Sequence, residues 1–186
     1  MKLKIFVLFF TILSLVESVH AQTVFASTLK IGPFSLDMKN DAVDKIIGKK
    51  LSKAELKDNT ENYEKMIDVN VGGVLYKLDF NNNYNKDGDL VGTYKLAKIK
   101  CNDAKVVTKS GIAIGMDKYD VLKKLDGMNI AFRFIKYSEY DNDGKPTNKF
   151  KEYIEISDRT AYSVLSLEIE NSKITGFEVS YQEDGC

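Results

Sequence analysis

Two acidic, glycine-containing segments hold the residue types that could bind a metal ion. Residues 83–90 read NYNKDGDL and residues 139–144 read EYDNDG. Alternating oxygen ligands, a glycine and a following apolar residue are typical of the start of a calcium-binding loop. Both segments lack the bidentate glutamate at the twelfth position, where Tyr94 and Phe150 stand. Asp-Gly between apolar strands is also an ordinary hairpin turn. We therefore expect turns here, with no metal ion and no cofactor.

The sequence contains one histidine, His20, which lies near the N-terminus. If the N-terminal segment is removed, Ser-His-Asp and Cys-His nucleophilic systems are excluded, as are imidazole metal ligands. Aspartate and glutamate are plentiful, so acid–base catalysis by paired carboxylates remains available. No carboxylate pair stands out from the solvated charges around it. We expect a protein that is not an enzyme, with no catalytic residues.

The two cysteines, Cys101 and Cys186, form the one possible disulfide. Export to an oxidising compartment would permit this bond. Cys101 falls on a predicted buried strand face, however, where a lone cysteine often acts only as a small apolar residue. Both states of the pair remain open from the sequence.

The N-terminus indicates export. Residues 1–21 contain two early lysines, the apolar run IFVLFFTILSLV and a small residue at Ala21, which is typical of a secretory signal peptide. The run is shorter than the ~20 residues of a membrane-spanning helix, so we expect no transmembrane segment. Cleavage after Ala21 would give a periplasmic or secreted chain with 25 basic and 26 acidic residues. This balance gives no electrostatic reason to expect nucleic acid as a partner.

Helical and strand patterns then alternate twice along the chain. Apolar residues at helical spacing occur near residues 42–47 and 121–125, with Asp37 and Asp117 as expected N-caps. Ser52 and Glu55 form a capping box that opens a further short helical turn. The pattern predicts an α+β fold of two tandem units, each a short helical segment packed on an antiparallel sheet of about four strands. The predicted strands are 66–71, 74–80 and 93–101 in the first unit, then 129–137, 150–157, 163–169 and 173–181 in the second.

The two units can be aligned with each other at an offset of 78 residues. Met38 then meets Met116, Val43 meets Val121, and Ile99 meets Phe177 without a gap. Agreement at both ends of the unit with one offset indicates an internal duplication. We expect a first repeat at 22–105 and a second at 106–186.

The start of the second repeat resembles a known family. Residues 111–127 follow the pattern GI-x-IGM-x-K-x-x-V-x-x-x-L-x-G and precede an antiparallel sheet. This segment resembles the β-lactamase inhibitory protein family, whose fold the small lipoproteins of outer-membrane protein assembly share. The resemblance implies two tandem units that span nearly all of the mature chain. The matching residues are Gly111, Ile112, Gly115, Met116, Val121, Leu125 and Gly127, and the first half echoes them at Leu36, Met38, Val43 and Gly48.

Strand alternation assigns each side chain to a covered or a free face of the sheet. We expect Ile130, Phe132 and Phe134 in the core, together with the other apolar residues of their parity. The opposite parity contains tyrosine and arginine, which anchor protein interfaces, and methionine, which packs adaptably. If the two sheets join edge to edge, these residues would form one continuous apolar patch, unless edge strands, loops or the other half cover them. The predicted partner-binding residues are Met66, Leu75, Tyr94, Leu96, Arg133, Ile135, Tyr137 and Tyr153.

Three functions from different classes fit these observations. The preferred one is an exported, non-enzymatic module that binds an unidentified protein partner with the free sheet face, as an enzyme inhibitor would. The alternative is an envelope assembly or structural factor, although no cysteine follows the apolar run to carry a lipid anchor. A hydrolase that uses carboxylates is the least favoured, because the sequence shows no catalytic constellation.

Overall fold

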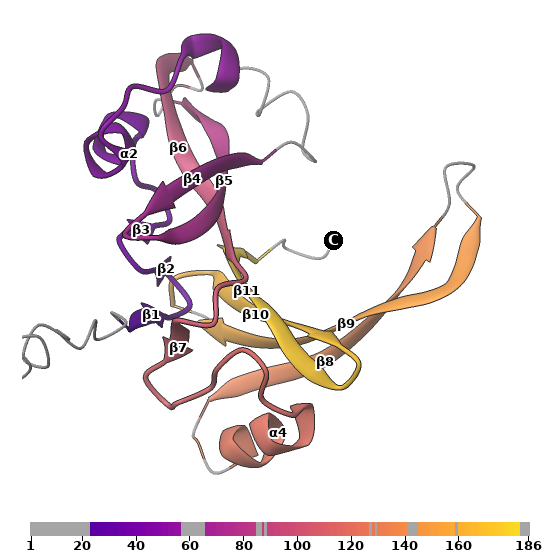
Figure 1. Cartoon of the computed structure of the whole chain (residues 1–186). Helices are drawn as coiled ribbons and strands as arrows, with labels where there is room; N and C mark the ends of the chain where they lie inside the picture. Colours follow the sequence, from indigo (N-terminus) through magenta and orange to yellow (C-terminus); the bar gives the residue numbers. More distant parts are fainter. Residues whose placement is uncertain are drawn as a thin grey trace, which may run out of the picture.

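The computed structural model describes residues 23–56, 66–84, 87, 89–126, 128, 130–140, 145–158 and 160–182. The predicted signal peptide and Cys186 lie outside these residues, as do most of the Asp-Gly turns at 85–88 and 141–144. Figure 1 shows a β-rich molecule with helices α2 and α4 beside a long, curved sheet. The described residues are mostly β, with two sheets and short helices, and this composition is compatible with the expected α+β class.

Seven strands form one continuous antiparallel sheet that runs through both halves of the sequence. The halves meet edge to edge, because β6 pairs with β11 through Cys101 with Phe177 and Ile99 with Val179. The order across the sheet is β4 (Ile67–Val71), β5 (Val74–Tyr84), β6 (Leu90–Cys101), β11 (Lys173–Tyr181), β10 (Ser163–Glu170), β9 (Pro146–Asp158) and β8 (Ala131–Tyr140).

One face of this sheet is covered by a layer of short elements. In the middle lies a small sheet of order β3 (Phe34–Ser35), β2 (Lys30–Ile31), β1 (Val24–Ala26) and β7 (Val106–Thr108), in which β1 and β7 are parallel. Helix α2 (Asn40–Ile47) and a helical turn at 53–56 belong to the first half of the sequence, and α4 (Lys118–Asp126) belongs to the second half. Val43 of α2 and Val121 of α4 are both buried in the same core as the strands.

The core is built from two cross-strand rows of apolar side chains, because residues directly opposite in antiparallel strands share a face. At the centre of the rows, Leu78, Ile99, Phe177 and Val179 are fully buried. One row runs Val69, Tyr76, Cys101, Phe177, Leu167, Ile154 and Phe134, and the other runs Ile67, Leu78, Ile99, Val179, Leu165, Ile156 and Phe132.

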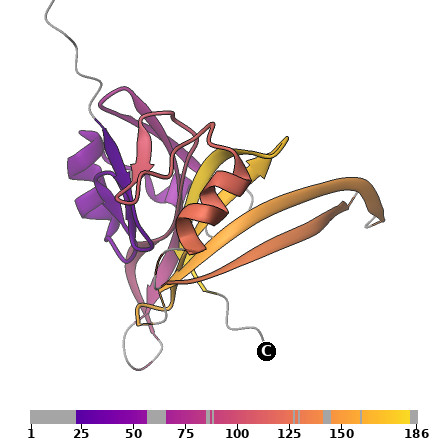
Figure 2. The same cartoon turned by 90° about the horizontal axis from the view of Figure 1, so that it is seen from below.

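The prediction that Ile130, Phe132 and Phe134 lie in the core is wrong. Phe132 and Phe134 do occupy the predicted face, opposite Ile156 and Ile154, but they are the outermost members of the two rows. Strand β8 is the edge of the sheet and extends past the covering layer, as the arm formed by β8 and β9 shows in Figures 1 and 2. Phe134 is consequently 45% exposed, and Ile130 just before the strand is also exposed.

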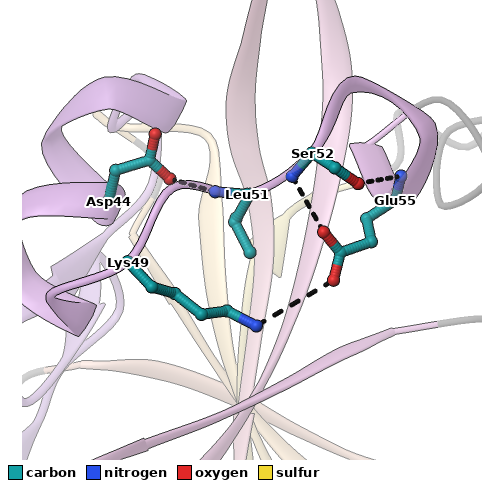
Figure 3. Close-up of polar contacts among 5 residues, drawn as sticks. All are labelled: Asp44, Lys49, Leu51, Ser52 and Glu55. Atoms are coloured by element: carbon teal, nitrogen blue, oxygen red, sulfur yellow. Dashed lines mark hydrogen bonds and ion pairs between the residues drawn. The ribbon is translucent and has the colours of Figure 1, made fainter.

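The helix ends test three local predictions. Asp117 caps α4 as expected, since its Oδ1 accepts a hydrogen bond of 2.8 Å from Tyr119 N. Asp37 does not cap α2, which begins only at Asn40; Asp37 instead adopts a left-handed conformation with φ 63°. The capping box is confirmed: Glu55 N donates to Ser52 Oγ at 3.1 Å and Ser52 N donates to Glu55 Oε2 at 2.8 Å (Figure 3).

Backbone contacts of the first half recur in the second half at the offset of 78 residues. Asp37 N donates to Leu96 O, and Gly115 N donates to Ile174 O, 78 residues later. The equivalent pairs Leu96 N with Met38 O and Ile174 N with Met116 O, and the isolated bridges Lys39 with Lys95 and Asp117 with Lys173, follow the same offset.

In the part of the chain that the structure describes, no helix is long and apolar enough to cross a membrane.

Candidate binding face

The face of the seven-stranded sheet opposite the core carries a row of charged side chains, and we call it the free face. Helices α2 and α4 both pack on the other side, so neither covers it (Figures 1 and 2). One row crosses all seven strands, with Ser166 as its single uncharged member. Its members in order are Asp68, Lys77, Lys100, Glu178, Ser166, Glu155 and Arg133.

Ion pairs neutralise the carboxylates of the free face. Arg133 Nε donates to Glu155 Oε2 at 2.7 Å, directly across the β8–β9 pair. Lys98 Nζ lies 3.6 Å from Glu178 Oε1, diagonally across the β6–β11 pair. Lys100 of β6 pairs with Glu168 of β10, on the far side of β11. The glutamates lie deeper than most of their basic partners, since the side chain of Glu155 is 13% exposed and that of Arg133 is 57% exposed. At the Arg133–Glu155 and Lys98–Glu178 pairs, an approaching partner therefore meets the cationic side chain first.

A polar hollow of about 580 Å³ lies on this face. Its walls come from both sequence halves, because it spans β5, β6 and the strands β8 to β11. Ser166, Ser180, Tyr137 and Tyr181 border it beside the charged residues. The charged residues that line the hollow are Asp79, Lys98, Arg133, Glu155 and Glu178.

Burial raises the pKa of the Glu178 carboxyl above its ordinary value, and the neighbouring Lys98 and Lys100 only partly oppose this effect. Desolvation disfavours the charged form of a carboxyl group, whereas a nearby cation favours it. Glu178 occupies the centre of the sheet, where β6 and β11 join the two halves. The ion pairs on this face are thus partly desolvated rather than fully solvated.

The structure brings four of the predicted partner-binding residues together at one end of the free face. Arg133, Ile135 and Tyr137 follow one another along β8, and Tyr153 lies opposite Ile135 on β9. The rings of Tyr137 and Tyr153 pack edge to face with centroids 6.1 Å apart. Tyr137 is 53% exposed, so this end presents an aromatic side chain next to the hollow.

Leu75 and Met66 lie at the opposite end of the sheet. Leu75 is 49% exposed on β5 and borders a smaller hollow together with Lys77 and Lys100. Met66 directly precedes β4 and is half-buried. The charged row separates these residues from the tyrosines of β8 and β9. The free face is therefore a charged surface with apolar side chains at both ends, and not the continuous apolar patch that we expected.

Leu96 and Tyr94 are not available to a partner on the free face. Leu96 is completely buried in the core, and Tyr94 is half-buried against the same core. A β-bulge explains the error: Asp79 pairs with Lys98, but the next residue, Phe80, pairs with Leu96. The extra residue in β6 reverses the alternation, so Leu96 joins Ile99 on the covered face.

Sequence reasoning missed the charged pairs themselves. Lys98 and Lys100 alternate with the buried Ile99 and Cys101, and this pattern in the sequence already indicated a solvated strand face. Which carboxylate neutralises which lysine depends on the β6–β11 register, and no local pattern predicts that register.

The thiol of Cys101 is buried and donates a hydrogen bond to Leu75 O at 3.3 Å. Burial raises the pKa of this thiol above its usual value, so the reactive thiolate is disfavoured. Its predicted partner, Cys186, lies outside the described residues. Within the described ranges, no group of three or more histidine, cysteine, aspartate or glutamate side chains is placed to hold a metal ion.

No protein-family model, curated protein or solved structure matches the chain.

Proposed function

We propose that the chain is an exported, non-enzymatic protein that binds a partner protein on its free face. One observation carries this proposal: no helix of the described residues covers one broad face of the seven-stranded sheet, and a hollow of about 580 Å³ lies on this face. Tyr137 and Arg133 at one end belong to the residue types that most often anchor protein interfaces.

The charge arrangement indicates the kind of partner surface that fits. Arg133 and Lys98 are the more exposed members of their ion pairs, whereas Glu155 and Glu178 lie deeper. We infer that the partner contributes acidic side chains or carbonyl oxygens over these cations and an apolar group against Tyr137. Such complementarity contributes to the choice of partner and to the rate of association more than to affinity itself.

We propose further that the sheet arose by internal duplication, with tandem units at 22–105 and 106–186. The recurrence of the backbone contacts of Asp37 and Met38 at Gly115 and Met116 supports this proposal. A sheet of this kind agrees with the resemblance to the β-lactamase inhibitory protein family. We therefore propose enzyme inhibition as the form that binding takes, with the target enzyme unidentified.

The first experiment is affinity capture from the envelope and secreted fractions of the cells that produce the chain. The surface that the captured protein covers is then mapped by comparing lysine acetylation of the free chain with that of the complex. Lys77 and Lys98 are accessible on the free face, and Lys123 is an exposed control on α4. Protection of Lys77 and Lys98 but not of Lys123 is the expected result. Protection of Lys123 alone would place the partner on the helical side and overturn the proposal.

A further inference from the structure

Strand β8 is an open edge of the seven-stranded sheet. It pairs with β9 on one side and is the last strand in the sheet order on the other. Its ten residues, AFRFIKYSEY, include no proline and no glycine. The other edge, β4, has only five residues. A long edge strand presents a row of free backbone N–H and C=O groups that can pair with another strand.

The apolar side chains of β8 are incompletely covered. Phe132 and Phe134 end the two core rows and are exposed to solvent on the side of α4. Lys118 of α4 extends over the ring of Phe134, 5.5 Å from its centroid, but in the described part of the chain no further strand lies beside the ring in the sheet. One more strand would cover the exposed sides of both rings.

Natural sheets often place basic residues on an edge strand to prevent such pairing. The two basic residues of β8 are Arg133 and Lys136, and each contacts a carboxylate of β9. Arg133 pairs with Glu155 at 2.7 Å, and Lys136 Nζ lies 3.4 Å from Glu152 Oε1. Lys118 of α4 also contacts Glu152, at 2.9 Å. The carboxylates of β9 therefore reduce the positive charge of the edge, and with it the repulsion of a second strand, without cancelling it.

We propose that the occupant of this edge is β8 of a second copy of the chain, paired antiparallel about a twofold axis at Ile135. In this register Phe134 faces Lys136 of the second copy, and Arg133 faces Tyr137 of the second copy. Each contact occurs twice, and each places a cation beside an aromatic ring. Registers centred on Arg133 or Lys136 would instead place like charges directly opposite each other. The two repeated cation–ring contacts make β8 self-complementary about Ile135, as a twofold interface requires.

The test is the mass of the wild-type chain in solution, measured by light scattering during size-exclusion chromatography. At a concentration on the order of 100 μM, a dimer with a micromolar dissociation constant is the dominant species. We expect twice the mass of one chain for the wild type and for the control Leu75→Lys, which alters an exposed leucine far from β8. Ile135→Lys places two like charges opposite each other at the axis, so it should give the mass of a single chain.

A cross-linking variant keeps the test decisive if Ile135→Lys fails to fold. Ile135→Cys in a Cys186→Ser background should form an intermolecular disulfide on mild oxidation, because the two residues at the axis face each other. Lys151→Cys, on β9, should not cross-link. A wild-type mass of one chain overturns the proposal. A dimer that persists in Ile135→Lys and does not cross-link at residue 135 overturns it as well, because another surface then joins the copies.

Discussion

Leu96 and Leu75 provide a matched test of the β-bulge that separates the core from the free face. Both are leucines of adjacent strands that strand alternation assigns to the free face, but Leu96 is 0% exposed and Leu75 is 49% exposed. Truncation of a fully buried leucine to alanine costs about 2–5 kcal/mol, because the transfer free energy is lost and a cavity remains. Complete burial of a leucine side chain contributes roughly 1.5–3 kcal/mol, so the half-exposed Leu75 should lose only about 1 kcal/mol.

The assay is urea unfolding of the wild type, Leu96→Ala and Leu75→Ala. With a slope of about 2 kcal/mol per molar urea, Leu96→Ala should lower the midpoint by roughly 1–2.5 M and Leu75→Ala by about 0.5 M. Equal midpoint shifts would refute the reasoning, because both leucines would then lie in equivalent environments. An unchanged slope in both variants is needed for the midpoints to report stability alone.

Three further predictions follow from the same structure. Burial raises the pKa of Glu178 above its ordinary value of 4.5, so the stability that protonation contributes is present below pH 4.5 and is lost as the pH rises through the raised pKa. Urea unfolding should therefore show that Glu178→Gln gains stability relative to the wild type across this pH window. A difference in stability that stays constant with pH would contradict this prediction. In thermal unfolding, Gly32→Ala should lower the stability by about 2–4 kcal/mol, because its φ is 58° and a Cβ would lie 2.6 Å from Tyr76 Oη. Gly48→Ala should lower it by only about 1 kcal/mol, because φ is 69° but a Cβ would meet open space. The thiol of Cys101 should resist labelling in the native protein, and rapid labelling without denaturant would show that it is not buried.

The sequence predicted the local features of this fold because they depend on neighbouring residues. The capping box of Ser52 and Glu55 needs only a spacing of three, and the buried alternation of Tyr76 and Leu78 needs only one strand. Asp37 shows where local reasoning failed. It resembles an N-cap in type and position, but its N–H donates to Leu96 O, which places the residue in a contact with β6 instead of at the start of α2.

The errors at the candidate site arise from information that only the assembled sheet contains. The bulge that buries Leu96 depends on how β5 and β6 pair, and nothing in the residues around Leu96 marks the change of face. The exposure of Phe134 depends on β8 being the edge strand, which the order of strands decides. The ion pair of Lys98 with Glu178 joins residues from different sequence halves. Residue type indicated that these positions matter, but sheet order decides which of them a partner can reach.

The central claim, that the free face binds the partner, is tested most directly by the dissociation constant of the captured partner for two tyrosine variants. Tyr137 is 53% exposed on the free face, and Tyr119 is 62% exposed on α4. Loss of an interface anchor weakens binding by on the order of 2 kcal/mol, about thirtyfold. We predict a loss of this size for Tyr137→Ala and an unchanged dissociation constant for Tyr119→Ala. A loss confined to Tyr119→Ala, or none in either variant, would contradict the claim that Tyr137 and the free face contact the partner.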